Sequence, residues 1–489
     1  MRKKWGNRIG AIVLACALTM NGLPVQSISA STQKAYAAAK SETGKQDVSQ
    51  PETKMGNVVL DGNDIAVNNV NGLTYKGFGM LSGNSTSDLL MDYKAEQPKA
   101  YAELMQYLFG GNYPIMNHVK LEMGNDRNTS TGPESCTKRT EKEKANVLRN
   151  PGWQLAADAR KINPKIKVSI LRWEAPVWAG TDEKIYQWYK ETILDAYEKY
   201  GYMVDYINPN INEKWDVDSD VAFTKKFAKW IAAETKETIP DEKALALYHK
   251  IKLVVSDEAG TASDSVVESM KSDSDFYNSV DVVGYHYSPW DDSNGGMKWL
   301  AQTKDKEVWN SEAQAAFSNS AFRPANNVKD PTTEGTGLGG TGSALEMANT
   351  FIKGFVQSRR SHVIYQPAIG SFYEGAQFSF KELVSARDPW SGWIHYDAGL
   401  LMLAHISKFA VTGWENEDNT VGIWRAVPQA SKCTADGTNP VNGRNGGENY
   451  MTLASPAKDN FSTMIVNDSE YPMEYKIQTK NMKLAEDQN

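Results

Sequence analysis

This sequence contains few cysteines and has no large excess of charge of either sign. Its 489 residues include three cysteines, and 53 Lys and Arg stand against 60 Asp and Glu, for a net charge of −7. Three cysteines are too few for a disulfide-rich scaffold or a multi-cysteine structural zinc site. A mildly acidic chain lacks the basic face that binds a phosphate backbone, so we expect no nucleic-acid partner.

The sequence motifs of several common enzyme classes are also missing. The chain has no H-E-x-x-H, no paired histidines at metal-ligand spacing and no EF-hand loop, so we expect no metal site and no cofactor. It has no G-x-S-x-G and no G-x-x-x-x-G-K-[ST], which argues against an α/β-hydrolase or a P-loop enzyme. With 40% apolar and 23% charged residues, its composition is that of a globular protein.

The hydrophobic run at the N-terminus is too short to span a bilayer. Residues 9–20 are apolar and follow four basic residues, the pattern of a secretory signal. We interpret residues 1–37 as a signal peptide cleaved after Ala37, and expect a secreted protein with no integral membrane segment afterwards. A lipid anchor through Cys16 is a less favoured alternative. Residues 1–37 hold five basic and no acidic residues, so their removal lowers the net charge to −12.

Two regions that flank the central part of the chain differ from it in pattern. Residues 38–56 are polar and aperiodic, which predicts a disordered leader. Residues 57–74 contain short apolar runs with Asp-Gly and Asn-Gly turns, and residues 397–489 lose helical periodicity after about position 410 and alternate instead. We predict that both segments contribute to one antiparallel β-sandwich. Cys136 and Cys433 either pair or remain thiols, and the sequence leaves this open.

Between residues 75 and 396, short apolar runs alternate with amphipathic stretches of helix length. The predicted strands are 76–80, 119–123, 166–171, 202–211, 252–255, 281–287, 307–310 and 362–366. The predicted helices include 99–108, 153–162, 182–200, 221–235 and 345–358. Eight strands alternating with helices predict an α/β fold, a (β/α)8 TIM barrel with a flanking antiparallel β-sandwich. A doubly wound sheet is the alternative, weakened because no G-x-G-x-x-G follows the first strand.

Polar residues at the ends of the predicted strands are the candidates for chemistry, because barrel enzymes place reactive groups there. The fourth strand ends in Asn212 and Glu213, and the seventh in Glu312. Two glutamates facing each other across a barrel mouth fit retaining hydrolysis of a glycosidic bond. One carboxylate attacks the anomeric carbon, and the other acts as acid and then base. Asn212, directly before the acid, is placed to hydrogen-bond a sugar 2-hydroxyl.

Each of these residues also has an ordinary structural interpretation. A glutamate that ends a strand is usually solvated or ion-paired, and only the two glutamates together favour catalysis. His286 is either a sugar ligand or a hydrogen-bonded histidine in the barrel rim. Asp257 is either a partner of the catalytic groups or a helix cap. Trp173 is either a wall against a pyranose face or a core residue.

Several motifs, taken in chain order, resemble the galactocerebrosidase (galactosylceramidase) family, glycoside hydrolase family 59. They cover about residues 57–420 and are G-F-G-M-L-S-G-N-S-T-S-D-L-L-M-D-Y (77–93), V-K-L-E-M-G-N-D-R-N-T-S-T-G-P-E (119–134), R-W-E-A-P-V-W (172–178), N-E (212–213), V-D-V-V-G-Y-H-Y (280–287), W-N-S-E (309–312) and D-P-W-S-G (388–392). The resemblance implies a (β/α)8 barrel flanked by a β-sandwich, and retaining hydrolysis of a terminal β-galactoside.

The resemblance also implies roles for individual residues. Glu213 matches the acid/base and Glu312 the nucleophile of the family. Asn212, Trp173 and Thr129 match sugar-binding positions of the family. We also expect His286 and Trp390 to bind the substrate. The expected partner is a carbohydrate or glycolipid substrate. Two alternatives stay open: a glycosidase of the same mechanism that acts on a galactan or other oligosaccharide, and a non-catalytic carbohydrate-binding barrel.

Overall fold

The computed structural model describes most of the chain after residue 51. The described residues are 52–83, 86–127, 132–258, 261–286, 295–313, 344–366, 368–370, 383–410, 425–433, 447–455, 461–467 and 471–482. The predicted signal peptide and most of the predicted leader therefore lie outside the described residues.

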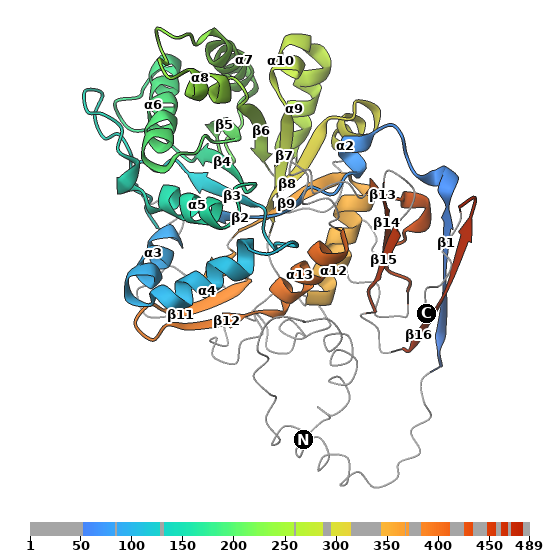
Figure 1. Ribbon diagram of the computed structural model, residues 1–489. Helices are drawn as coiled ribbons and strands as arrows, with labels where there is room; N and C mark the ends of the chain where they lie inside the picture. The colour runs from blue at the N-terminus through green and yellow to red at the C-terminus, as the bar shows by residue number, and fades with distance from the viewer. Residues whose placement is uncertain are drawn as a thin grey trace, which may run out of the picture. The chain divides into compact units, whose positions relative to one another are not determined.

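A closed barrel of eight parallel strands forms the centre of the described structure (Figure 1). Its strands are β2 (Gly77–Ser82), β3 (His118–Glu122), β4 (Lys167–Arg172), β5 (Tyr206–Ile211), β6 (Lys252–Glu258), β7 (Val282–His286), β8 (Glu307–Ala313) and β9 (Arg360–Tyr365). The barrel closes where β2 pairs with both β3 and β9. All eight predicted strands are present, which confirms the predicted (β/α)8 fold.

Helices lie outside the barrel, and all of them except α13, which follows β12, connect successive barrel strands. They are α3 (Thr86–Glu96), α4 (Pro98–Phe109), α5 (Pro151–Ile162), α6 (Asp182–Tyr200), α7 (Val217–Ala233), α8 (Glu242–Tyr248), α9 (Thr261–Ser272), α10 (Ser274–Ser279), α11 (Gly296–Lys298), α12 (Ala344–Ile352) and α13 (Ala398–Ala410). A short helix, α2 (Val70–Leu73), precedes β2. Two π-helical turns, Trp299–Thr303 and Lys353–Gln357, extend α11 and α12.

Local sequence signals fix where several of these helices begin. Asn150 accepts a hydrogen bond from the Gly152 amide at the start of α5, where Pro151 is the first helical residue. Thr181 caps α6 and Asp216 caps α7 in the same manner. A side-chain oxygen at this position satisfies an amide that has no partner within the helix. These caps explain why α6 has the boundaries that the sequence predicts.

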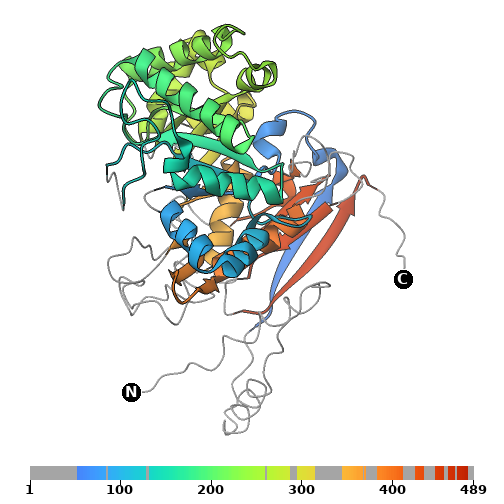
Figure 2. The ribbon, with the colours of Figure 1, turned by 60° about the vertical axis from the view of Figure 1, so that its left-hand side comes forward.

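Strands outside the barrel form three smaller sheets. Strands β13 (Arg425–Ala426), β14 (Tyr450–Ala454) and β15 (Phe461–Ile465) form an antiparallel sheet. Strands β1 (Lys54–Asp61) and β16 (Met473–Lys480) form a parallel pair (Figure 2). Strands β10 (Ile369–Gly370), β11 (Val384–Asp388) and β12 (Trp393–Tyr396) form a mixed sheet.

The β1–β16 pair packs against the sheet that contains β14. Leu60 of β1 shares an apolar cluster with Val427 and Ala454. The Tyr450 hydroxyl donates to the Asn57 carbonyl at 3.0 Å. The flanking antiparallel sheet agrees with the prediction, and residues from both ends of the described chain meet there. The pairing of β1 with β16 is parallel, however, where the sequence predicts antiparallel strands.

The structure corrects three boundaries of the sequence-based division. β1 begins at Lys54, inside the predicted disordered leader. The barrel strands end at Tyr365, whereas the predicted barrel extends to residue 396; the strands Ile369–Gly370, Val384–Asp388 and Trp393–Tyr396 form the separate β10–β12 sheet. Residues 398–410, assigned to the sandwich, form α13. This helix contacts the barrel wall, since the hydroxyls of Ser407 and Tyr75 lie 3.4 Å apart.

A layer of buried aromatic and polar side chains fills the barrel near the N-terminal ends of its strands. His118 of β3 and His362 of β9 lie with Nδ1 and Nε2 3.0 Å apart and their rings stacked. The other nitrogen of His118 lies 2.7 Å from the Ser169 hydroxyl. Trp309 packs against both rings. Burial lowers the pKa of both histidines, that of His362 to about 4, so both are neutral near pH 7.

Cys136 and Cys433 are not joined to each other by a disulfide in this structure, and the Cys433 Sγ donates to the Asn349 carbonyl at 3.7 Å. Among the described residues, no helix combines the length and the apolar character needed to cross a membrane.

Candidate active site

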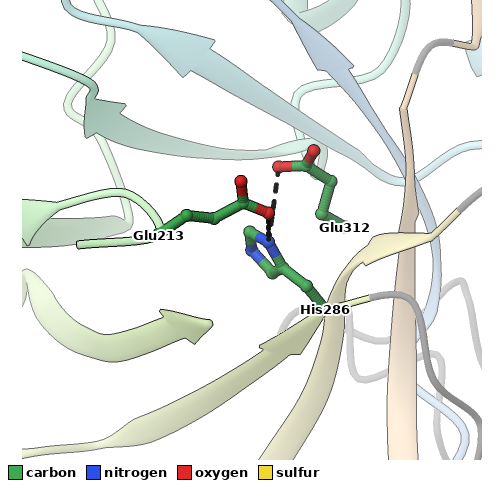
Figure 3. Close-up of side chains that lie close together, drawn as sticks. All are labelled: Glu213, His286 and Glu312. Carbon is green, nitrogen blue, oxygen red and sulfur yellow. Dashed lines mark hydrogen bonds and ion pairs between the residues drawn. The ribbon is translucent and has the colours of Figure 1, made fainter. Parts of the chain in front are cut away.

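The predicted pair of glutamates meets at the C-terminal end of the barrel (Figure 3). Glu213 is the second residue after β5, and Glu312 lies in β8. A carboxylate oxygen of Glu213, one of Glu312 and a ring nitrogen of His286 all lie within 4.8 Å of one another. The structure therefore brings together three residues that the sequence places 73 and 26 positions apart along the chain.

His286, the last residue of β7, lies between the two glutamates. Its Nδ1 is 2.9 Å from the Glu213 Oε1 and 3.7 Å from the Glu312 Oε2. Its Nε2 is 3.5 Å from the Asp257 Oδ1. The imidazole is fully buried, whereas 39% of the Glu213 side chain and 3% of the Glu312 side chain are exposed. His286 therefore contacts carboxylates on three different strand ends.

A second charged group, which sequence reasoning missed, supports His286 from inside the barrel. Lys120 of β3 is buried, and its Nζ lies 3.1 Å from the Asp257 Oδ1 and 3.2 Å from the Ser311 carbonyl oxygen. The Asn208 amide donates to the other Asp257 oxygen at 2.8 Å. The available sequence signal is a lysine between Val119 and Leu121, because a charge within a buried strand needs a partner.

Charge–charge interactions outweigh burial at the two central groups. Burial by itself would raise the pKa of Asp257, but Lys120 and His286 hold that pKa well below its ordinary value. Burial by itself would lower the pKa of His286, but Glu312, Asp257 and Glu213 raise it to about 9. Asp257 is therefore ionised and His286 is a cation near pH 7.

Irregular backbone at the strand ends aims these side chains inward. The pairing register shifts between Ser256 and Glu258 and again between Tyr285 and His286. Glu213, Ser256 and Asp257 have positive φ angles of 55°, 75° and 48°, which non-glycine residues rarely adopt. Bulges and such conformations gather at functional sites because they redirect side chains away from the regular alternation.

Two residues of β6 hold the segment that carries Glu213. The Glu213 amide donates to the Asp257 carbonyl at 3.1 Å, and the Trp215 amide donates to the Glu258 carboxylate at 2.5 Å. Burial raises the pKa of Glu258 to about 7. These two bonds fix the position of Glu213 although its backbone conformation is unfavourable.

The remaining predicted site residues have different environments. Asn212 is buried, and neither side-chain polar atom of its amide has a hydrogen-bond partner among the described residues. Trp173 is half-buried and packs against the apolar cluster that contains Leu171 and Trp309. Thr129 lies outside the described residues.

Trp390 is not brought into this group by the structure. It lies in the turn between β11 and β12, and its side chain is 67% exposed. Its carbonyl accepts a hydrogen bond from Gln97, the residue before α4, at 3.0 Å. This contact joins Trp390 to the start of a helix outside the barrel. The prediction that Trp390 binds sugar is based on the motif D-P-W-S-G and not on a position at the end of a barrel strand.

Arg172, at the end of β4, has a structural role. It is buried, and its Nε donates to the Pro209 carbonyl at 3.0 Å. This bond satisfies a carbonyl of β5 where the register between β4 and β5 shifts.

The three donor atoms of Glu213, His286 and Glu312 are close enough together to suggest a metal site. A metal ion would need the Nδ1 lone pair of a neutral imidazole. The Nδ1 of His286 lies 2.9 Å from the Glu213 Oε1 in this structure, and a bound metal ion would have to replace this hydrogen bond. We therefore describe the group as hydrogen-bonded acids and bases.

Comparisons with known proteins find a family and several proteins that are similar to this chain. Residues 75–408 match the family described as "Glycosyl hydrolase family 59". Galactocerebrosidases are among the similar proteins: that of Danio rerio is 25% identical over 357 residues, 70% of this chain and 46% of that protein. The Homo sapiens protein is 26% identical over 350 residues, 70% of this chain and 44% of that protein. This chain thus matches less than half the length of these relatives.

Solved structures with a similar fold include two proteins that share little sequence with this chain. The endo-β1,6-glucanase BT3312 has a TM-score of 0.56 at 14% identity, covering 86% of this chain and 87% of that one. The catalytic domain of xylanase C from Talaromyces cellulolyticus has a TM-score of 0.51 at 12% identity, covering 82% and 84%. At this identity the likeness supports the barrel fold alone.

Proposed function

Because the chain belongs to glycosyl hydrolase family 59, we propose that it hydrolyses terminal β-galactosyl linkages with retention, through a covalent glycosyl-enzyme intermediate. The observation that carries this proposal is the approach of the Glu213 and Glu312 carboxylate oxygens to within 4.8 Å. Retaining glycosidases hold their two carboxyl groups about 5–5.5 Å apart, whereas inverting ones need about 6.5–9.5 Å to admit a water molecule.

The different environments of the two glutamates support their separate roles. Glu312 is nearly inaccessible to solvent, which suits a nucleophile that attacks the anomeric carbon from within the site. Glu213 is partly exposed, which suits a group that protonates the leaving oxygen and later takes a proton from water. In this proposal Glu213 is the acid/base and Glu312 the nucleophile.

We assign sugar binding to the residues around this pair. The buried amide of Asn212, directly before Glu213, has the donor and acceptor that a sugar 2-hydroxyl needs. The half-buried Trp173 offers an aromatic face to the pyranose ring. Thr129 and Trp390 remain proposed sugar contacts through the family motifs alone.

The β-galactoside preference rests on the names of the relatives, which are galactocerebrosidases. A galactolipid is therefore the first substrate to test, and a galactan or other galactosyl oligosaccharide is the second. Export through residues 1–37 is likewise a proposal, and N-terminal sequencing of protein recovered from the culture medium tests it.

Replacing the two glutamates tests the proposed mechanism. Glu312→Gln should lower kcat on nitrophenyl β-galactoside by about 10⁴-fold or more, because the attacking carboxylate is lost. Glu213→Gln should cost less on that substrate than on an alkyl galactoside, since a good leaving group needs little protonation. NMR of the first-formed sugar should show the β-anomer.

Glu307→Gln is the matched control, because Glu307 lies at the opposite end of β8 from Glu312 and should leave kcat unchanged. Full activity in Glu312→Gln, or an α-anomer as the first product, would refute the retaining mechanism. Folded protein that binds galactosides without cleaving any would favour the non-catalytic alternative.

A further inference from the structure

Four carboxylates and one buried lysine surround His286. The proposed mechanism needs only two glutamates, so the other charged groups require a further explanation. Of the described residues, the groups near it are Glu213 after β5, Asp257 and Glu258 of β6, and Glu312 of β8. Lys120 of β3 lies behind Asp257. These interactions use both ring nitrogens of the imidazole: Nδ1 faces both glutamates, and Nε2 faces Asp257.

We propose that Lys120 and Asp257 are positioning residues that keep His286 a cation in a fixed place, so that its Nδ1–H is the counter-ion of whichever glutamate is negative. This inference rests on the proposed retaining function and adds residues to it that act through His286. Lys120 keeps the buried Asp257 ionised, and Asp257 in turn keeps the second proton on the Nε2 of His286.

The distances fit a charge that changes place during the reaction. In the first step, a Glu312 oxygen bonds to the anomeric carbon, the bond from that carbon to the leaving oxygen breaks, and the Glu213 proton moves to the leaving oxygen. The negative charge thereby passes from Glu312 to Glu213. In the second step, water attacks the anomeric carbon, Glu213 takes the water proton, and the ester bond to Glu312 breaks, which returns the charge to Glu312.

His286 keeps both protons throughout this cycle. Its Nδ1 is 2.9 Å from Glu213 and 3.7 Å from Glu312, so the N–H donates a hydrogen bond to Glu213 and is close enough to Glu312 to stabilise a negative charge there through space. A preorganised donor of this kind stabilises developing charge without reorganisation. A neutral imidazole would hold a single proton. If that proton were on the Nε2, which faces Asp257, the Nδ1 would have no proton to donate to a glutamate.

The geometry around Asp257 shows why its position is closely fixed. It receives the Asn208 amide on one oxygen and faces Lys120 and His286 with the other. Its own carbonyl accepts from the Glu213 amide. One residue thus sets both the charge on His286 and the backbone of the proposed acid/base.

The protonation state of His286 in the full-length protein provides a test that needs no substrate. In ¹⁵N-histidine NMR spectra, with the His286 signal assigned by its loss in His286→Gln, both ring nitrogens should carry protons at pH 7. In Asp257→Asn the midpoint of this titration should fall by at least about one pH unit, because the charge that faces Nε2 is removed. Lys120→Met should shift it in the same direction, and Lys120→Arg should restore it.

Kinetics provide the second readout. Asp257→Asn should lower kcat by about 10²-fold, and the alkaline limb of its pH profile should move down together with the His286 midpoint. Lys167→Met and Asp205→Asn are matched controls, because these residues form an ion pair at 3.3 Å at the other end of the barrel. Neither control should move the midpoint or the alkaline limb.

The possible failures are distinguishable. A neutral His286 at pH 7 in the unmodified protein overturns the inference, and this measurement does not require that any variant folds. An unchanged midpoint in folded Asp257→Asn or Lys120→Met also overturns it. If no glycoside is hydrolysed although His286 behaves as expected, the proposed function fails instead.

Discussion

The two ends of the same barrel hold buried histidines in opposite states. At the N-terminal end, His118 and His362 stack on each other, and burial lowers the pKa of both. At the C-terminal end, His286 is equally buried, yet neighbouring carboxylates raise its pKa to about 9. Burial alone therefore does not fix the charge of a histidine in this protein: it prevails at His118 and His362, whereas the neighbouring carboxylates outweigh it at His286.

Lys120 lies near the boundary between these two environments. It contributes to the lowered pKa of His118, two residues earlier in β3, and to the lowered pKa of Asp257. One buried cation thus favours a neutral histidine on one side and an ionised carboxylate on the other. The backbone does not follow this division, because positive φ angles occur at both ends: at Glu213, Ser256 and Asp257 at the C-terminal end, and at Asp305 and Arg359 just before β8 and β9.

The largest expected difference between the two ends of the barrel comes from adding a methyl group at each of them. At one end the methyl group should lower activity, and at the other it should lower stability. At Gly284 a Cβ would overlap the Ser311 hydroxyl and lie 2.5 Å from the Asp257 Oδ1. Gly284→Ala should therefore lower kcat by about 10²–10³-fold, because it displaces the residue that supports His286. Steady-state kinetics on a nitrophenyl β-galactoside measure this.

The matched change at the other end is Gly79→Ala, where a Cβ would lie 2.9 Å from the His118 Cβ. It should lower the free energy of unfolding by about 1–3 kcal/mol and leave kcat of the folded protein nearly unchanged. Equal losses of kcat in the two variants would mean that the two ends are not functionally distinct.

The two ends should also respond oppositely to pH. The pKa of His362 is lowered to about 4 in the folded protein, so protonation of the unfolded chain lowers stability as pH falls from about 6.5 to about 4, by roughly 3 kcal/mol. The pKa of His286 is raised to about 9, so its contribution is complete below about pH 6.5 and is lost as pH rises through about 9.

Denaturant unfolding across this pH range tests both signs. His362→Gln should remove part of the acid loss but keep the alkaline loss, and His286→Gln should do the reverse. Identical pH profiles for the two variants would contradict the opposite states of the histidines.

The smallest expected effect concerns the hydrogen bond of His118. Ser169→Ala removes the hydroxyl 2.7 Å from its Nε2 and should lower the free energy of unfolding by about 1 kcal/mol. Because Ser169 lies far from Glu213 along the barrel axis, kcat/KM should stay within about twofold of the unmodified value. Thermal unfolding combined with kinetics measures both, and a large loss of kcat/KM would connect this layer to the site.

Most of the barrel and the central pair of the candidate site could be predicted from the sequence. Apolar runs of strand length marked all eight strands, and α6 has the predicted boundaries because Thr181 caps it. Glu213 and Glu312 could be proposed because barrel strands end at a common edge. The boundaries were less accurate beyond Tyr365, where α13 has an apolar sequence within a region assigned to strands.

The sequence alone determined the order of strands and helices and the residue types at the strand ends, because these depend on local periodicity and capping. Only the tertiary structure decided that Lys120, Asp257 and His286 form one charged chain behind the two glutamates. Their state depends on Coulomb interactions in a buried environment, which vary with distance through space and not with separation along the chain. The parallel pairing of β1 with β16 likewise joins two segments that are separated by most of the chain. No local pattern of residues in the sequence predicts such a pairing.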